Sequence, residues 1–289
     1  MARRHPILRG FAVVAGLAVL AALAARLGAW GWLVGPRVGV AELTGVLRDG
    51  DALEEALEEF RKDPAIVAVV LRVDSPGGAV APAQELYEAV WRLRREKPVV
   101  ASFGNVAASA AYYVASAADA IVADPGTLTG SIGAIMELVD ASALAAKVGL
   151  KDAVVKSGPF KDVGQPLRPM TDEDRRLLQG MVDDVLAQFV AAVARGRGMP
   201  PERVRALADG RPYSGAQAQA AGLVDELGGL EAAERLAWQR AGRTGEPRVT
   251  RVRPHRWPWW LAYLTDAAAP PPAGLSGGLL LLYAGALPR

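Results

Sequence analysis

Cysteine is absent from this chain of 289 residues, and histidine occurs only twice, at His5 and His255. The lack of cysteine excludes disulfides, thiol nucleophiles and cysteine-ligated metals. Both histidines lie outside the globular middle of the sequence, so neither a Ser–His–Asp triad nor a histidine-based metal site can be assembled there. We therefore expect no metal site and no cofactor.

A strong charge of either sign is also lacking. The sequence holds 33 Lys and Arg residues against 31 Asp and Glu residues, a formal net charge of +2. This balance gives no case for nucleic-acid binding, and we expect no nucleic-acid partner. Hydrophobic residues make up 51% of the chain, and much of that apolar excess lies toward its two ends.

The N-terminal segment has the pattern of a membrane anchor. Residues 1–9 are basic, and Gly10–Ala25 is an unbroken apolar run, interrupted by Arg26 and somewhat short for a span of about 20 residues. The pattern predicts a transmembrane helix within residues 1–36. Its basic end would face the cytoplasm and the rest of the chain the extracytoplasmic side. The alternative is a cleaved signal peptide, because the run contains the small residues of LAALAA.

Residues 37–242 alternate strand and helix patterns, which predicts an α/β domain with right-handed crossovers. The expected strands are Val38–Leu43, Ile66–Val73, Val99–Phe103, Ala120–Ala123 and Ala153–Lys156. The expected helices are Ala81–Arg95, Ser142–Val148, Glu202–Ala208, Leu230–Ala241, the amphipathic Asp51–Lys62 and the long Asp172–Arg195, which is capped by Thr171.

Residues 243–289 form a C-terminal extension of different character. It is first basic, then aromatic, and it ends in the apolar run GLSGGLLLLYAGAL after the linker AAAPPPAG. The final run is too short to span a bilayer comfortably. Two interpretations stay open: a disordered tail with apolar patches, or a segment that lies on the membrane surface or folds back on the domain.

One stretch, PVVASFGNVAASAAYYVASAA at 98–118, is suited to hold a nucleophile. It predicts a strand, a turn at Gly104 and Asn105, and a helix of small residues with Ser109 in its first turn. Backbone N–H groups at a helix N-terminus are unpaired, and the helix dipole favours negative charge there. An oxyanion formed beside Ser109 would meet the N–H of Ala110. The alternative is that Ser109 is only a small residue in a tightly packed helix.

A serine nucleophile needs a base, and lysine can replace histidine when burial keeps its amine neutral. The reference pKa of a lysine is ~10.4, and desolvation can lower it by up to ~3–5 units. Loops that follow predicted strands, where α/β folds place their sites, are DSPGG at 74–78, GNVAAS at 104–109 and SGPFKD at 157–162. Lys161 lies in the third loop, and Lys156 is its nearest rival; the residues alone leave both open.

Taken together, the motifs DSPGG, NVAASAAYYVASAAD, TGSIG, SGPFKD and GRPYSGAQAQAAGLVD resemble the signal peptide peptidase A family. These are membrane-anchored proteases with a Ser–Lys dyad and a ClpP/crotonase-like fold, a repeated ββα superhelix. The resemblance covers roughly residues 38–241. It implies that Ser109 is the nucleophile and Lys161 the general base. It also implies that Gly78 and Ala110 supply the oxyanion hole and that Ser131 orients the lysine amine.

The chain departs from the family pattern in having Ala110 and Ala111 where glycines usually follow the nucleophile. Alanine keeps the N–H, but its methyl group narrows the cleft, which puts substrate preference in doubt. The chain holds a single copy of the fold, and the resemblance implies a homo-oligomer in which neighbouring subunits complete each dyad.

The expected function is an extracytoplasmic serine endopeptidase that degrades remnant signal peptides or other short apolar peptides at the membrane. Three alternatives remain. A related membrane protease would cut a partner membrane protein, a crotonase-type enzyme would act on acyl-CoA, and a scaffold would have no activity.

Overall fold

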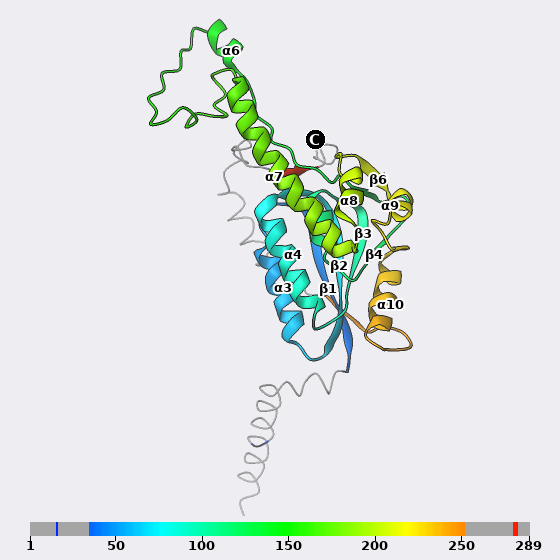
Figure 1. Cartoon of the computed structure of the whole chain (residues 1–289). Helices are drawn as coiled ribbons and strands as arrows, with labels where there is room; N and C mark the ends of the chain where they lie inside the picture. The colour runs from blue at the N-terminus through cyan, green and yellow to red at the C-terminus, as the bar shows by residue number, and fades with distance from the viewer. Residues whose placement is uncertain (1–15, 17–34, 252–279, 283–289) are drawn as a thin grey trace, which may run out of the picture.

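The computed structural model describes residues 16, 35–251 and 280–282. The predicted N-terminal transmembrane helix and most of the predicted C-terminal extension lie outside these residues. The described part is a mixed α/β structure, as the sequence predicts (Figure 1). The ββα superhelix and the domain boundaries 1–36, 37–242 and 243–289 stay predictions.

One sheet forms the centre of the described fold. Its main path runs β6 (Pro212–Ser214), β5 (Leu128–Gly130), β3 (Val99–Ala108), β2 (Ile66–Ala79), β1 (Arg37–Leu47) and β8 (Val249–Arg251). Off this path, β4 (Ala120–Ala123) pairs with β3 and β7 (Glu226–Leu227), and β9 (Leu280–Leu282) pairs with β2. Only the β5–β6 and β2–β9 pairs are antiparallel among the described strands.

Helices cover both faces of the sheet. One face packs on α3 (Asp51–Lys62), α4 (Val80–Arg94), α5 (Ala110–Ala115) and α7 (Asp172–Arg197), and the other on α10 (Leu230–Arg240). Two short helices, α8 (Pro201–Leu207) and α9 (Gly215–Ala221), lie beside β6 (Figure 1).

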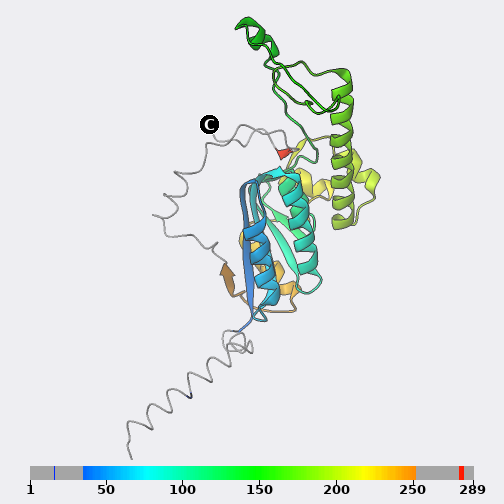
Figure 2. The ribbon, with the colours of Figure 1, turned by 90° about the vertical axis from the view of Figure 1, so that its left-hand side faces the viewer.

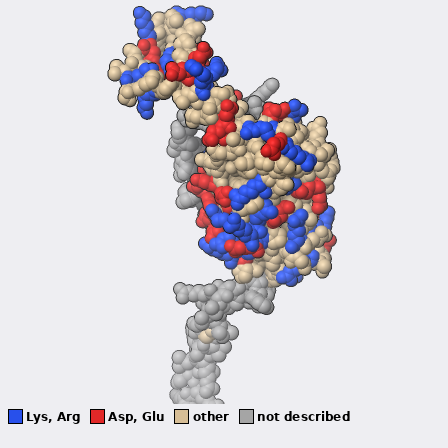
Figure 3. Space-filling view, viewed as in Figure 1, with Lys and Arg blue, Asp and Glu red and all other residues tan. Residues whose placement is uncertain are grey.

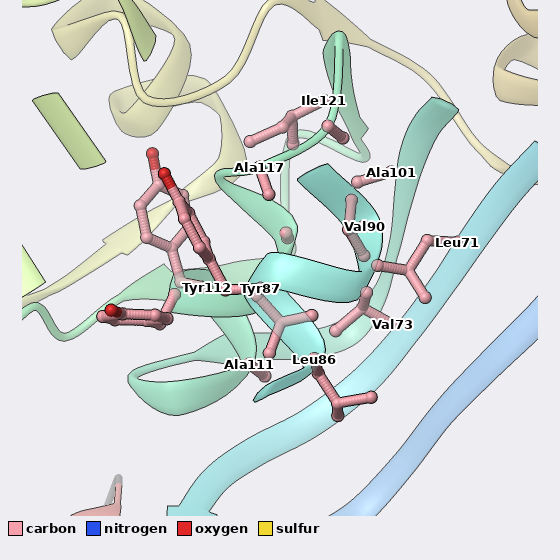
Figure 4. Packing of buried hydrophobic residues seen from close by; sticks show 14 of the residues in the cluster. Leu71, Val73, Leu86, Tyr87, Val90, Ala101, Ala111, Tyr112, Ala117 and Ile121 are labelled. Carbon is pink, nitrogen blue, oxygen red and sulfur yellow. The ribbon is translucent and has the colours of Figure 1, made fainter. Parts of the chain in front are cut away.

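Strand β2 shows why its nearly continuous apolar sequence forms a central strand. Successive side chains point to opposite faces, so Leu71 and Val73 join the core under α4, and Val70 joins the core under α10. Strands buried on both faces need such runs. Figure 4 shows the larger core, to which Leu86 and Tyr87 of α4 and Tyr112 of α5 all belong.

The two tyrosines after Ser109, Tyr112 and Tyr113, are packing residues. The Tyr112 hydroxyl donates to the carbonyl of Leu223 (2.9 Å), and burial raises the pKa of Tyr112. The Tyr113 ring meets Tyr87 edge-on at a centroid distance of 5.2 Å and lies 5.0 Å from Phe189 of α7. These contacts fix α5 between α4 and α7.

Residues 135–181 project from the body, and we call this segment the arm. It contains α6 (Ser142–Lys147), irregular loops and the N-terminal half of α7 (Figures 1 and 2). In the space-filling view the arm stands clear of the body (Figure 3). The C-terminal half of α7 packs on the body through Phe189, Val190 and Val193. By length and composition α7 could cross a membrane, a test that core helices also pass.

Three sequence predictions are wrong in detail. The chain does not turn at Gly104 and Asn105, because β3 continues to Ala108 and pairs there with β5. The DSPGG motif belongs to β2 rather than to a loop after it. Residues 153–156 are irregular, because they lie on the arm, where no strand in the described residues pairs with them.

Candidate active site

Ser109 lies between the end of β3 and the start of α5, as the N-cap of that helix rather than within its first turn. Its φ of 56° and ψ of −122° are unusual for a residue other than glycine and cost about 1–3 kcal/mol. Two bonds maintain this conformation. The Ser109 N–H donates to the Gly130 carbonyl (2.8 Å), and the Ser109 carbonyl accepts from the Tyr113 N–H (2.9 Å).

The hydroxyl of Ser109 is buried and unpaired. The residue is 1% exposed, and its Oγ has no hydrogen-bond partner among the described residues. Leaving a buried hydroxyl unpaired costs about 1–3 kcal/mol. A strained backbone and an unpaired hydroxyl at one residue are typical of a position kept for chemistry rather than for stability.

Gly78 lies on the strand next to the one that ends at Ser109. Strands β2 and β3 pair through Ser75 and Ala107, and α5 also contacts β2. The φ of Gly78 is +158°, and a Cβ added to this residue would lie 2.0 Å from the Leu47 carbonyl oxygen. Only glycine therefore fits this position without moving β1.

Ala110 begins α5 and is fully buried. The N–H groups of a helix's first turn have no acceptor within the helix, so the Ala110 N–H, next in the chain to Ser109, needs an acceptor from outside α5. Its methyl group lies in the buried core cluster.

Ser131 follows β5, a strand beside β3 that the sequence pattern does not predict. Its φ is 50°, it is 6% exposed, and its N–H donates to the Arg211 carbonyl (3.0 Å). The carbonyl of the preceding residue, Gly130, accepts the hydrogen bond from the Ser109 N–H. The TGSIG sequence, with two glycines around a small polar residue, is the signal that could have indicated this support.

Lys161 is exposed and belongs to the arm, the segment that projects from the body (Figure 1). Its side chain makes no hydrogen bond or ion pair to any residue that the structure describes. Since the Ser109 hydroxyl is also unpaired, one copy of the chain does not bring the two side chains within hydrogen-bonding distance. The rival lysine, Lys156, binds Asp162 Oδ1 (2.8 Å) and the Pro159 carbonyl (3.0 Å).

Strand β9, from the apolar end of the chain, lies at this site. It pairs antiparallel with β2, with Leu282 opposite Gly77, Leu281 opposite Gly78 and Leu280 opposite Ala79. Figure 1 shows it in red near the C-terminus label. The β2 segment with Gly78 thus accepts an extended chain as a neighbour. Part of the tail folds back on the domain, one of the two interpretations left open.

The side chains at this site are hydroxyl and apolar groups. Within the ranges that the structure describes, no three His, Asp or Glu side chains are grouped so that they could hold a metal ion. The arrangement suits acyl transfer, with a serine hydroxyl and backbone N–H groups.

Comparisons with known proteins agree with this chemistry. The model of the family described as "Peptidase family S49" matches residues 92–243, about half of the chain. A Synechocystis protein named as a "putative protease" is 41% identical over 71% of this chain and 75% of its own length. A "putative signal peptide peptidase SppA" from Enterococcus faecium is 38% identical over 60% of this chain and 50% of its own. The "Serine protease SPPA, chloroplastic" of Arabidopsis thaliana is 34% identical over 70% of this chain and 30% of its own.

The chain thus spans three quarters of the Synechocystis relative and half or less of the other two. The matched region contains Ser109 together with the loop that carries Lys161. The chain therefore belongs to peptidase family S49, the family of the signal peptide peptidase A proteases, and is a serine-type peptidase.

Proposed function

We propose that this peptidase is an endopeptidase with a Ser–Lys dyad that degrades remnant signal peptides or other short apolar peptides at the extracytoplasmic membrane face. Ser109 is the nucleophile, and Lys161 of a neighbouring copy is the general base. The observation that carries the proposal is the buried, unpaired hydroxyl of Ser109 on a strained backbone, combined with a lysine on a projecting arm.

The proposed reaction is acyl transfer in two steps. Neutral Lys161 takes the proton of Ser109 as the hydroxyl attacks the substrate carbonyl, with Ser131 orienting the amine. The N–H groups of Gly78 and Ala110 stabilise the oxyanion. The lysinium then protonates the leaving amine, and water attacks the acyl-enzyme to release the second product.

A neighbouring copy is the proposed source of the lysine because the arm has the surface of an interface. Most of the large apolar side chains exposed in the described structure lie on the arm. Because monomers rarely expose apolar patches of this size, such a surface indicates a contact with another molecule. These exposed apolar side chains are Ile135, Val139, Leu144, Val148, Leu150, Val154, Val155, Phe160, Met170, Leu177 and Met181. Head-to-tail contacts between identical chains close into rings when the rotation allows. The proposed assembly is such a ring, in which each arm reaches the next body.

The proposed substrate binds as an added strand. The pairing of β9 with Gly77–Ala79 supports this, since an extended apolar chain already fits that edge in the antiparallel direction. A predicted membrane anchor in residues 1–36, with a basic cytoplasmic end, would hold the body beside peptides released from the membrane.

Mixing two inactive variants tests the dyad and its assembly together. Ser109→Ala and Lys161→Ala should each abolish hydrolysis of an apolar peptide while leaving the circular dichroism spectrum unchanged. Co-assembled in equal amounts, they should recover about a quarter of wild-type activity. With random mixing in a head-to-tail ring, that fraction of sites joins an intact serine to a neighbour's intact lysine.

The Ser109→Ala, Lys161→Ala double variant mixed with either single variant is the control, and it should stay inactive. Full activity of either single variant would refute the dyad. No recovery in mixed assemblies, when mixing is verified by mass spectrometry, would refute completion of the site by a neighbour.

A further inference from the structure

The arm is held together by charged groups instead of a hydrophobic core. In the whole arm, residues 135–181, only Ala145, Asp162 and Asp174 are buried. Carboxylates are almost never fully buried unless they are paired. Since two of the three buried residues are carboxylates, this segment depends on a specific ionic network.

Arg168 joins the two buried carboxylates. Its guanidinium contacts both oxygens of Asp174 (2.5 and 3.2 Å) and Oδ1 of Asp162 (3.0 Å). Asp174 also accepts from the Thr171 N–H (3.0 Å) and so completes the capping box of α7. Charge-assisted bonds of this fork geometry fix orientation as well as position. The network therefore links Asp162 to the start of the helix that packs on the body.

Asp162 also determines what the two lysines of this loop can do. Residues 158–165 form successive tight turns, with the Lys161 N–H bonded to Gly158 and the Gln165 N–H bonded to Asp162. In these turns Asp162 is buried while the adjacent Lys161 is exposed. Asp162 binds the ammonium of Lys156 at 2.8 Å, so that amine is engaged within its own loop.

We infer that Asp162, bridged by Arg168 to Asp174, is a positioning residue that orients Lys161 away from the arm and keeps Lys156 out of the reaction. The inference rests on the proposed function, because it concerns the approach of Lys161 to Ser109 of the next copy. The Lys156 ammonium, followed by Arg168, holds the pKa of Asp162 below its usual range, so the network stays ionised at neutral pH.

Asp162→Asn tests the inference because it keeps the shape of the side chain and removes its charge. In the assembled full chain we expect kcat to fall about 10- to 100-fold, as for small displacements of a reacting group, while KM stays unchanged. Asp162→Glu should restore part of kcat. A merely structural role would reduce the yield or unfolding temperature of the assembly but not the kcat of the assembled fraction.

Asp152→Asn is the matched control, since Asp152 is exposed on the same arm and its kcat should not change. If the Asp162→Asn variant does not assemble, the Arg168→Lys variant serves as the test instead. Lysine keeps the charge but loses the planar fork, and kcat should again fall.

Wild-type kcat in both variants, with Lys161→Ala inactive, would overturn the positioning role and leave the dyad intact. An active Lys161→Ala enzyme would instead overturn the dyad itself.

Discussion

The backbone at Gly78 leaves no room for a side chain. Gly78→Ala would place a methyl group 2.0 Å from the Leu47 carbonyl oxygen, so β1 and β2 must separate there. The separation would move the Gly78 N–H away from the proposed oxyanion position. We expect kcat to fall about 10²- to 10³-fold, the usual cost of losing one oxyanion donor, as measured by peptide hydrolysis.

Gly126→Ala is the matched control for this prediction. A Cβ at Gly126 meets nothing within 4 Å, so the substitution changes a glycine of a neighbouring loop without a clash. It should leave kcat unchanged. Equal effects of the two substitutions would show that Gly78 has no special place in the site.

At the same scale, the sequence predicted which residue types could do the chemistry but not their conformations. The missing histidines and the small residues around Ser109 indicated a serine with a lysine base. The positive φ of Ser109 depends on a bond to Gly130, and that of Ser131 depends on a bond to Arg211. In each pair the two residues are distant in sequence. No local pattern specifies such contacts.

At the scale of elements, the prediction was accurate where periodicity is strong. The boundaries of α3 and β4 agree with the sequence prediction, and Thr171 caps α7 as expected. The prediction was wrong where pairing with a distant segment determines whether a strand forms and where it ends. Strand β3 runs past Gly104 because β5 pairs with it, and residues 153–156 have an apolar strand pattern without a partner strand in the described fold.

The ionic network of the arm predicts a conformational response to acid. The Lys156 ammonium and the Arg168 guanidinium lower the pKa of Asp162, and Arg168 with the Thr171 N–H lowers that of Asp174. Folded-state values below the unfolded ones mean that this stabilisation is complete above about pH 4, the ordinary pKa of Asp. It is lost as the pH falls through the lowered values, so we expect the arm to loosen in strong acid before the body unfolds.

A single fluorophore can measure this response, because the chain has no cysteine and Lys151→Cys labels only the arm. Its anisotropy should be constant from pH 7 to about pH 4 and fall below that. Arg205→Cys, on α8 of the body, reports global unfolding as the control. With Arg168→Met the arm label should already be mobile at pH 7; an unchanged profile in that variant would contradict the role of the network.

Strand β9 gives a second prediction at this scale. It occupies the edge at Gly77–Ala79, where the proposed peptide strand would pair, so the two compete for one surface. Deleting residues 280–289 should lower KM for an apolar peptide and leave kcat unchanged. Initial-rate kinetics over a range of peptide concentrations measure both constants. An unchanged or higher KM would show that β9 does not compete with substrate.

At the scale of the whole molecule, one copy is an incomplete enzyme in the proposed mechanism. The site serine lies in the body, the lysine lies on the arm, and no contact between them is made within one chain. The family resemblance implied a dyad shared between subunits, but the residues alone could not show the separation, because the spacing of two residues along a chain does not say how far a projecting segment carries one of them.

The last prediction concerns the apolar surface of α6. Leu144 of α6 and Val148, the C-cap of that helix, are 65% and 71% exposed, so replacing both by Asp costs little in a single copy. Buried against a neighbour, two unpaired carboxylates would oppose assembly strongly. We expect a smaller particle by sedimentation, an unchanged circular dichroism spectrum and loss of activity that partly recovers at high protein concentration.

Leu227→Asp is the control, because this side chain is 40% exposed on the body, away from the arm. It should change neither particle size nor activity. If the α6 variant kept the wild-type particle size and activity, the arm would not be the contact between copies. Loss of activity at wild-type particle size would place α6 at the substrate path instead. Only loss of both, restored together by concentration, agrees with a site that two copies share.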